Sequence, residues 1–512
     1  MKRRKVLHSF FLKIDQMVKN NKGSADPRLH LKGIKIMNST RFKGLALFIL
    51  AISQLVLALD YTIIFVAMPS LGNELGFSAN HLQWVVSAYS LAFGGFLLIG
   101  GRLSDLMGRR RMFMIAIGLF GLGSLLGGLA ESQLMLIVAR ALQGLGGALL
   151  SPATLSLIMS NFAEGPERNR AMGIWAAMGG VGMSLGLLLG GILTSYIGWE
   201  ATFLVNVPIA LLVVILAPFV LKESKVSAAT KHYDAAGTIS VTASLLLVVY
   251  YLIQAPVEGW VSASTLPAAL IGVLMLLAFV MIEKRSKEPL ISFRMFRNRN
   301  LTGATLIAFL FSASFGSLYY FMTLYTQGVL EFSAIQSGFS FLPLTLSAFV
   351  GAKLINGMLS KVGVAGTIAT GMGLGVIGFL MLTGLSETGS AWGIIPGTVV
   401  IGIGQALVFT TMFIAGSAGI EPKEQGVASA LISTGQQIGG AIGLAVIMAI
   451  ISASLGTGTT LEHMLPADLN HAIHTAFLIA AATTLLGILV AFLALKQTKP
   501  STVDDIQVKA VH

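Results

Sequence analysis

Residues 57–62, with the sequence Leu-Ala-Leu-Asp-Tyr-Thr, lie inside the first long apolar segment of the chain, residues 44–68. An ionised carboxylate at the centre of a bilayer costs roughly 2.5 to 3.5 kcal/mol on insertion scales, so it is expected to be paired, hydrated or protonated. Asp60 is therefore the first candidate for a functional residue.

The composition is that of a polytopic membrane protein. Of the 512 residues, 55% are hydrophobic and only 11% are charged, with a mean hydropathy of +0.82; a soluble domain carries about 25% charged residues. The chain has no cysteine, which excludes disulfides, thiol catalysis and cysteine metal sites. It also lacks HExxH and P-loop motifs. An enzyme or an ATP-driven pump is thus not supported, and we expect no metal and no cofactor, with a proton gradient as the energy source.

The apolar segments predict an all-α polytopic membrane protein with fourteen transmembrane helices, since a helix needs about 20 residues to cross a ~30 Å hydrocarbon core. The segments fall near residues 44–68, 82–101, 112–130, 134–158, 171–192, 202–221, 236–255, 264–283, 301–325, 336–358, 365–385, 392–415, 426–452 and 472–495.

The lysines and arginines predict the orientation. Apart from Arg140, which lies inside a predicted helix, all of them fall in or beside segments that connect on the N-terminal side of the membrane. The positive-inside rule then predicts cytoplasmic termini and a location in the cytoplasmic membrane. This distribution explains the net charge of +12 without a nucleic-acid partner.

The two ends of the chain are predicted to be cytoplasmic tails, residues 1–43 and 496–512. A cleavable signal peptide is the competing interpretation of the N-terminus, but segment 44–68 is too long for a signal core and has no small-residue cleavage site. Met37 remains an alternative start of the protein.

An internal repeat relates the two halves of the chain. The stretch 144–149 (GLGGAL) corresponds to 402–407 (GIGQAL), and glycines spaced by four occur in both 171–192 and 426–452. Two related bundles around a site at the membrane midplane are typical of secondary transporters. The predicted domains are a six-helix bundle at 44–221, an inserted helix pair with its loops at 222–300 and a second six-helix bundle at 301–495.

Several local motifs resemble those of a known family. The stretch 101–111 (GRLSDLMGRRR) is similar to the signature loop of the major facilitator superfamily, and further stretches resemble its fourteen-helix drug:proton antiporter family. Leu187 departs from that family's pattern, which has a proline at this position. The further stretches are residues 59–62 with 67–69, residues 140–144, the fifth-helix glycines Gly179, Gly182, Gly186, Gly190 and Gly191, and residues 199–203 with Asn206 and Pro208.

The resemblance covers residues 44–495 and implies a multidrug efflux transporter. Such a protein would export lipophilic or cationic drugs, or related amphipathic compounds, in exchange for protons by alternating access. A proton-coupled importer of a small metabolite stays open because of Leu187, and a non-transporting sensor or scaffold is a further alternative. The expected partners are a small-molecule substrate, protons and the lipid bilayer.

Asp60 and Arg140 are predicted to meet inside the first bundle. Asp60 lies eight residues before Met68, about 12 Å from the outer end of its helix, and Arg140 lies six residues after Leu134, about 9 Å inside. The pair is either a permanent structural ion pair or the proton-coupling site. We favour proton coupling, because apolar residues could replace a purely structural pair at little loss.

The loop 101–111 is predicted to act as a cytoplasmic gate. Gly101 and Gly108 permit a tight turn, and Asp105 lies among arginines that include Arg109. The competing interpretation is that these arginines only follow the positive-inside rule.

The remaining candidates are polar and aromatic residues inside predicted helices. Gln143, Asn206, Phe315 and Tyr319 could line a substrate cavity, where aromatic rings would suit lipophilic cations. Interhelical hydrogen bonds and core packing are the alternatives. The fifth-helix glycines favour either tight static packing or a rocking interface.

Overall fold

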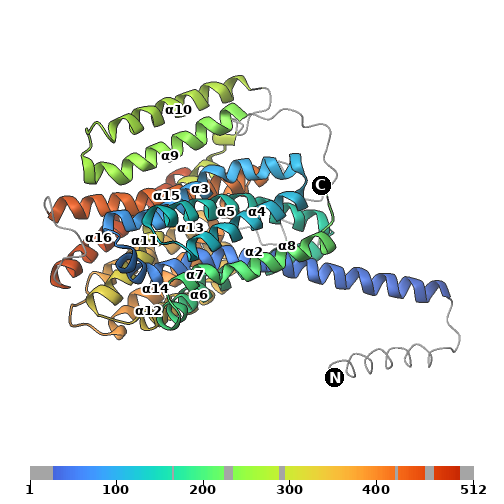
Figure 1. Cartoon of the computed structure of the whole chain (residues 1–512), viewed down its shortest axis with the longest axis horizontal. Coiled ribbons are helices and arrows are strands. Elements are labelled where there is room, and N and C mark those ends of the chain that lie inside the picture. Colours follow the sequence, from blue (N-terminus) through green and yellow to red (C-terminus); the bar gives the residue numbers. More distant parts are fainter. Residues whose placement is uncertain are drawn as a thin grey trace.

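The computed structural model describes residues 27–163, 166–223, 235–286, 295–420, 425–455 and 466–495, and in these ranges every regular element is helical. Most helices run side by side along the long axis of the molecule (Figure 1). They are α2 (Pro27–Leu75), α3 (Ala79–Met107), α4 (Arg109–Gly128), α5 (Gln133–Asn161), α6 (Pro166–Tyr196), α7 (Glu200–Leu204), α8 (Asn206–Val220), α9 (Ala235–Glu258), α10 (Leu266–Arg285), η1 (Met295–Arg297), α11 (Arg299–Thr323), η2 (Leu324–Val329), α12 (Ala334–Ser340), α13 (Leu342–Leu382), α14 (Ala391–Ser417), α15 (Gln425–Leu455) and α16 (Pro466–Ala494).

Eleven helical stretches in the described ranges are long and apolar enough to cross a membrane, so the chain is an integral membrane protein. Each predicted segment falls on helix. Element α13 contains two of these segments as two helices that meet at Gly363, whose φ of 71° and ψ of −174° are not helical. Helices α3 and α9 match predicted segments without being among the eleven. The number of fourteen spans therefore stays a prediction.

Local sequence explains several helix ends. Ser78 and Ser132 cap α3 and α5, because each hydroxyl accepts a backbone N–H of the first turn. Gly108 has a φ of 95° and makes the one-residue turn between α3 and α4. A side chain would strain that conformation, which accounts for glycine at this position.

The internal repeat reappears as two equivalent helix pairs, α2 with α6 and α11 with α15. In each pair, glycines four residues apart lie directly against the backbone of the neighbouring helix, so the helices approach closely. The glycines Gly182, Gly186 and Gly190 lie against Leu55, Leu59 and Ile63, and the glycines Gly435, Gly439 and Gly443 lie against Thr305, Phe309 and Ala313.

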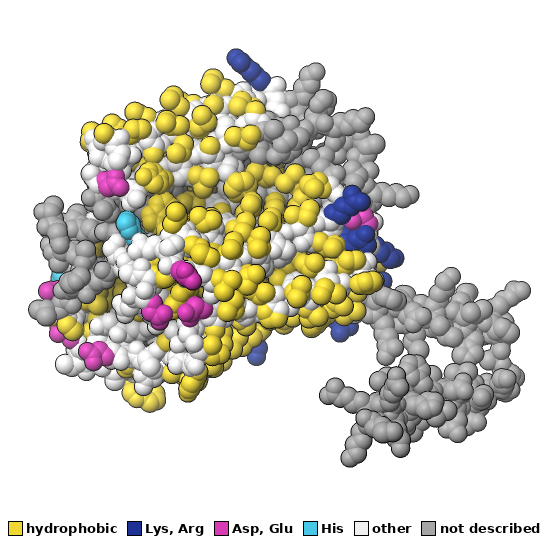
Figure 2. Space-filling model, in the orientation of Figure 1, with side chains coloured by type: hydrophobic (Ala, Val, Ile, Leu, Met, Phe, Trp, Pro, Cys, Tyr) yellow, Lys and Arg dark blue, Asp and Glu magenta, His cyan; other side chains and the backbone are white. Residues whose placement is uncertain are grey.

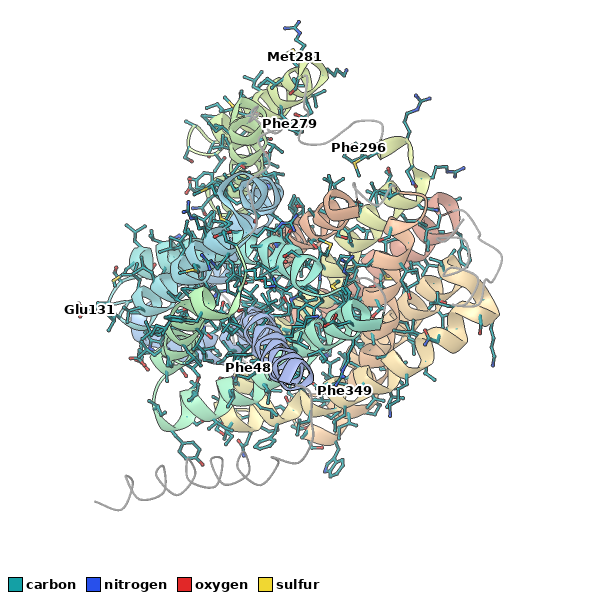
Figure 3. All side chains as sticks on the ribbon, turned by 90° about the vertical axis from the view of Figure 1, so that its right-hand side faces the viewer. Phe48, Glu131, Phe279, Met281, Phe296 and Phe349 are labelled. Atoms are coloured by element: carbon teal, nitrogen blue, oxygen red, sulfur yellow. The ribbon has the colours of Figure 1, made fainter. Side chains whose placement is uncertain are left out.

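Helices α9 and α10 lie outside the main bundle (Figure 1). Helix α9 packs against α3 and α15, and α10 packs against α9. Seen from the end of the molecule, Phe279 and Met281 of α10 lie far from the centre (Figure 3). The insertion of a helix pair between two six-helix halves stays a prediction.

The two halves meet along two seams. Helix α3 packs on α15, where Thr434 Oγ1 donates to the Gly94 carbonyl at 3.4 Å. Helix α12 packs on α6, where Ile335 N donates to Ser195 Oγ at 3.1 Å. The second seam lies at the C-terminal end of α6 and closes that end of the molecule between the halves.

Charged side chains separate along the long axis. Most of the Lys and Arg visible in Figure 2 gather at one end, and most of the Asp and Glu lie at the other. At the basic end, Lys43 Nζ lies 2.7 Å from Glu167 Oε1. Hydrogen bonds from Lys43 and from the Ala163 N–H lower the pKa of Glu167 from its ordinary value of 4.5.

Candidate functional site

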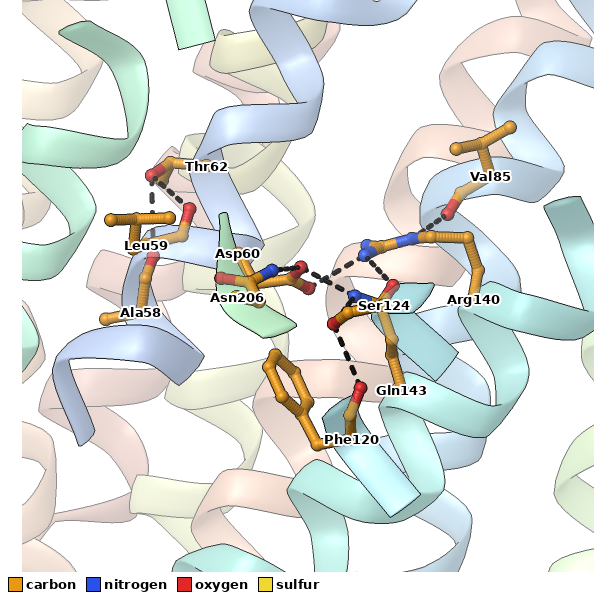
Figure 4. A network of polar contacts seen from close by, with 10 residues as sticks. All are labelled: Ala58, Leu59, Asp60, Thr62, Val85, Phe120, Ser124, Arg140, Gln143 and Asn206. Carbon is orange, nitrogen blue, oxygen red and sulfur yellow. Dashed lines mark hydrogen bonds and ion pairs between the residues drawn. The ribbon is translucent and has the colours of Figure 1, made fainter. Parts of the chain in front are cut away.

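Four polar side chains form a buried cluster in the N-terminal half (Figure 4). Asp60 of α2, Arg140 and Gln143 of α5, and Asn206 of α8 are each at most 1% exposed. Asp60 and Asn206 are 146 positions apart in the sequence, yet their side chains are in direct contact. We call these four residues the Asp60 cluster.

The carboxylate of Asp60 accepts three hydrogen bonds. Its Oδ2 accepts from Arg140 Nη1 at 2.8 Å, and its Oδ1 accepts from both Gln143 Nε2 and Asn206 Nδ2 at 2.8 Å. All three partners are N–H donors, which is the arrangement that suits an ionised carboxylate. The geometry is therefore that of an ion pair flanked by neutral amides.

Arg140 is held on several sides. Its Nη1 also donates to Gln143 Oε1 at 2.9 Å, and its Nε donates to the Val85 carbonyl at 2.8 Å. The guanidinium carbon lies 4.4 Å from the centre of the Tyr89 ring, which allows a cation–π contact. Both contacts to Val85 and Tyr89 come from α3, so the cluster ties α3 to α2 and α5.

Helix α4 also contacts the Asp60 cluster. Ser124 of α4 accepts from Gln143 Nε2 at 2.8 Å and donates to the Phe120 carbonyl at 2.9 Å. Gln143 thus uses its oxygen and both amide hydrogens.

The break between α7 and α8 places Asn206. Pro208 has no N–H to donate to the Leu204 carbonyl, and the regular helix is interrupted at Val205. Asn206 is the first residue of α8 and points at Asp60 (Figure 4).

The structure assigns the predicted cavity residues to different surroundings. Gln143 and Asn206 belong to the Asp60 cluster. Phe315 is 1% exposed, stacks on Phe311 and lies against Gly375 inside the C-terminal half.

Tyr319 lies between the halves of the protein. Its ring stacks on Phe65 of α2 and on Phe341 beside α13, and its hydroxyl is 3.0 Å from Gln405 Nε2. Of the four proposed cavity residues, Tyr319 is the one that contacts both halves.

The predicted gate loop 101–111 is wrong in extent, because α3 continues to Met107 and α4 begins at Arg109, which leaves Gly108 as the turn; this turn docks on α8. The side chain of Asp105 and the surroundings of Gly101 lie outside the described residues. Arg109 Nη1 donates to the Ser156 carbonyl of α5 at 3.4 Å. Gly108 lies so close to Glu223 that a Cβ there would be 2.7 Å from its Oε1.

Arg110 strengthens this docking. Its Nε lies 3.4 Å from Glu223 Oε2, and its Nη1 donates to the carbonyls of Pro218 and Leu221 at 3.1 and 3.2 Å. The loop is thereby anchored to the C-terminal end of α8, the same helix that begins at Asn206.

The fifth-helix glycines divide between two neighbours. Gly182, Gly186 and Gly190 face α2 within the N-terminal half, and Gly179 lies near Gln54 of the same helix. Gly191 instead faces the backbone of α12 across the seam between the halves. The residue Leu187 is 2% exposed, and its carbonyl faces Gly338 of α12.

Several residues that contact the Asp60 cluster were not predicted. Ser124, Tyr89 and the Val85 carbonyl contact Arg140 or Gln143, but none stands out in sequence, since a serine or tyrosine in an apolar helix is common. Glu223 was also missed. An acid next to the basic residues that end the sixth predicted helix was the available signal for it.

Comparison with known proteins identifies the family. The model described as Major Facilitator Superfamily matches residues 50–444. Among solved structures, the nucleoside transporter NupG superposes with a TM-score of 0.63 at 11% identity, covering 89% of this chain and 100% of that one. The peptide transporter POT gives 0.63 at 16% identity, covering 88% and 95%. The chain belongs to the Major Facilitator Superfamily and has its fold.

Curated relatives are resistance and export proteins. The chain is 36% identical over 428 residues to a puromycin resistance protein of Streptomyces alboniger, covering 83% of each chain. It is 38% identical over 419 residues to the cephamycin export protein CmcT of Amycolatopsis lactamdurans, covering 81% of this chain and 85% of that one. A tetracenomycin C resistance and export protein of Streptomyces glaucescens is 34% identical over 411 residues, covering 79% and 75%.

Proposed function

We propose that this chain exports antibiotics or similar amphipathic compounds from the cell in exchange for protons. Export is supported by relatives at 34% to 38% identity whose names state export of, or resistance to, antibiotics. Proton coupling is supported by the Asp60 cluster, in which a titratable carboxylate and Arg140 are both fully buried. That buried pair is the observation on which the proposal mainly rests.

The cycle is alternating access. A proton from the outside neutralises Asp60, which weakens its pairing with Arg140 and loosens the joint between α2, α5 and α8. Substrate leaves outward, the halves rock, and the proton is released inward as new substrate binds. The seam between α6 and α12 would open in the outward-facing state, and the loop ending at Gly108 would regulate the inner end.

The same proposal includes the membrane arrangement. We propose that the protein lies in the cytoplasmic membrane with both termini in the cytoplasm. It would cross the membrane fourteen times, with α9 and α10 as the inserted pair. The clustering of Lys and Arg at one end of the molecule supports this orientation (Figure 2).

A proton-coupled importer is the second candidate. The observation in its favour is Leu187, which replaces the proline that is usual in drug antiporters and lies at the seam with α12. A sensor or scaffold that keeps the fold is a third candidate, although such a protein would have no need for a titratable carboxylate in its core.

Transport in proteoliposomes tests the proposal. We would impose a proton gradient on vesicles with the full chain and follow internal pH together with labelled puromycin and a lipophilic cationic dye. We expect substrate to drive protons in the opposite direction. Asp60→Asn should abolish this exchange while the protein still inserts, and Glu387→Gln, which neutralises an exposed carboxylate, should not.

The other outcomes separate the candidates. Movement of substrate and protons in the same direction would establish an importer. Absence of flux with every compound of a broad drug panel would favour the scaffold. Proton exchange that survives Asp60→Asn would remove Asp60 as the coupling site.

A further inference from the structure

One amide of the Asp60 cluster is only half used. Asn206 Nδ2 donates to Asp60 Oδ1 at 2.8 Å, whereas Asn206 Oδ1 is buried and accepts no hydrogen bond from the described residues. A buried carbonyl without a donor costs about 1–3 kcal/mol. The amide keeps this orientation because an ionised carboxylate requires the N–H, not the oxygen, to face it.

The side-chain amide of Gln143 cannot turn over without losing hydrogen bonds. Gln143 Oε1 accepts from Arg140 Nη1 at 2.9 Å, and Gln143 Nε2 donates to Ser124 Oγ at 2.8 Å. Turning this amide over would place N–H against N–H at Arg140 and would break the bond to Ser124. Arg140 itself has donors only, so it cannot accept a hydrogen bond from a protonated acid.

The surroundings of the carboxyl contain few other groups that could respond to a proton. Helix α6 meets this part of α2 with glycine backbone. The charged or titratable side chains near Asp60 are Arg140 from α5, Tyr89 from α3 and the adjacent Tyr61 of α2. Helix α4 contributes Ser124, which contacts Gln143, and α8 contributes Asn206; neither side chain titrates.

We propose that Asn206 is a positioning residue that turns its amide over when Asp60 takes up a proton, an inference that rests on the proposed function. The proton adds to Asp60 Oδ1, and the new O–H donates to Asn206 Oδ1. Gln143 continues to donate to Oδ1, and Arg140 continues to donate to Oδ2. Only Asn206 changes orientation.

The energies of the two orientations are balanced. Before protonation the cluster contains an unsatisfied carbonyl, and afterwards it contains an unsatisfied N–H2 group, each at a cost of about 1–3 kcal/mol. The proton on Asp60 therefore decides the orientation. Asn206 is the first residue of α8 and lies two residues before Pro208, which has no N–H. The change therefore occurs where the helix lacks a backbone hydrogen bond.

Infrared difference spectra of the full chain in lipid test this inference. The carboxylic-acid C=O band that appears on acidification is assigned to Asp60 by its loss in Asp60→Asn. A C=O band lies at lower frequency when its O–H donates to an acceptor. Asn206→Thr and Asn206→Val have matched shapes, but only the threonine hydroxyl can both donate and accept.

We expect the Asp60 band at low frequency in the wild type and in Asn206→Thr, and at higher frequency in Asn206→Val. The wild type should also show an amide C=O band that shifts with pH and is lost in Asn206→Thr. This second readout does not require the valine variant to fold. An Asp60 band with the same frequency in all three proteins, or a pH-independent Asn206 amide band, would overturn the inference.

The outcome is separable from that of the proposed function. An Asp60 band that responds to Asn206 in a protein whose transport is not proton-coupled would support the switch and contradict antiport. Absence of any Asp60 carboxylic-acid band at the pH of transport would contradict both.

Discussion

Asp60 Oδ2 and Arg140 Nη1 lie 2.8 Å apart, with both side chains 1% exposed, in the interior of the N-terminal half. Taking two charges out of water is costly, and the pair is stable only because further hydrogen bonds surround it. Breaking this pair is therefore expected to change the stability of the protein more than breaking a surface ion pair would.

The first prediction concerns the cost of leaving one charge alone. Arg140→Leu should lower the free energy of unfolding by about 3–5 kcal/mol, because Asp60 remains buried without its cation. Adding Asp60→Leu should recover part of the loss, since no unpaired charge is then left. Thermal unfolding in detergent compares the three proteins with wild type. A double variant less stable than Arg140→Leu would contradict this account of the cluster.

The second prediction concerns the close approach of α2 and α6. A Cβ at Gly186 would collide with Thr62 Oγ1 and the Leu59 carbonyl, whereas a Cβ at Gly180 of the same helix meets nothing within 4 Å. Gly186→Ala should therefore destabilise the protein by about 1–3 kcal/mol. Gly180→Ala is the matched control and should be neutral or slightly stabilising, as measured by thermal unfolding. Equal effects at the two positions would show that the packing of α6 on α2 is not as tight as the structure has it.

The third prediction concerns the seam between the halves. Ser195 Oγ of α6 accepts the Ile335 N–H of α12 at 3.1 Å, and the chain has no native cysteine. Ser195→Cys combined with Ile335→Cys should therefore form a disulfide on mild oxidation. Because alternating access requires this seam to open, the disulfide should block transport, and reduction should restore it. Gel mobility and efflux assays provide the two readouts.

The control for the seam uses the same helix. Gly180→Cys combined with Ile335→Cys should neither cross-link nor lose activity on oxidation. Full transport by the cross-linked pair Ser195→Cys and Ile335→Cys would mean that α6 and α12 stay together throughout the cycle.

The fourth prediction concerns the pair Lys43–Glu167 at the basic end. Hydrogen bonds lower the pKa of Glu167 in the folded protein, so the pair contributes stability above the ordinary value of 4.5 and loses it as pH falls through the lowered pKa. Glu167→Gln should be slightly less stable than wild type at neutral pH. The difference should vanish in acid and shrink in high salt, since the glutamate is exposed. A stability difference that is independent of pH would rule out the carboxylate as its cause.

Much of the architecture follows from the sequence because a bilayer imposes simple rules. Apolar length predicted where the helices lie, and the spacing of glycines predicted that two helix pairs would pack alike. The same reasoning singled out Asp60 and Arg140, because a charge in an apolar segment is conspicuous. It also separated segments 336–358 and 365–385, and the structure divides the chain between them at Gly363, where the backbone is not helical.

The sequence by itself determined the class of protein and the side chains that are most costly to place in a membrane, since composition and helix periodicity are local properties. Only the tertiary structure decided what surrounds Asp60. It placed Gln143 and Asn206 on the carboxylate, separated Gly191 from the other glycines of α6, and joined Glu223 to the gate loop. These relations depend on how far each helix is rotated and shifted against its neighbours, which no local pattern specifies.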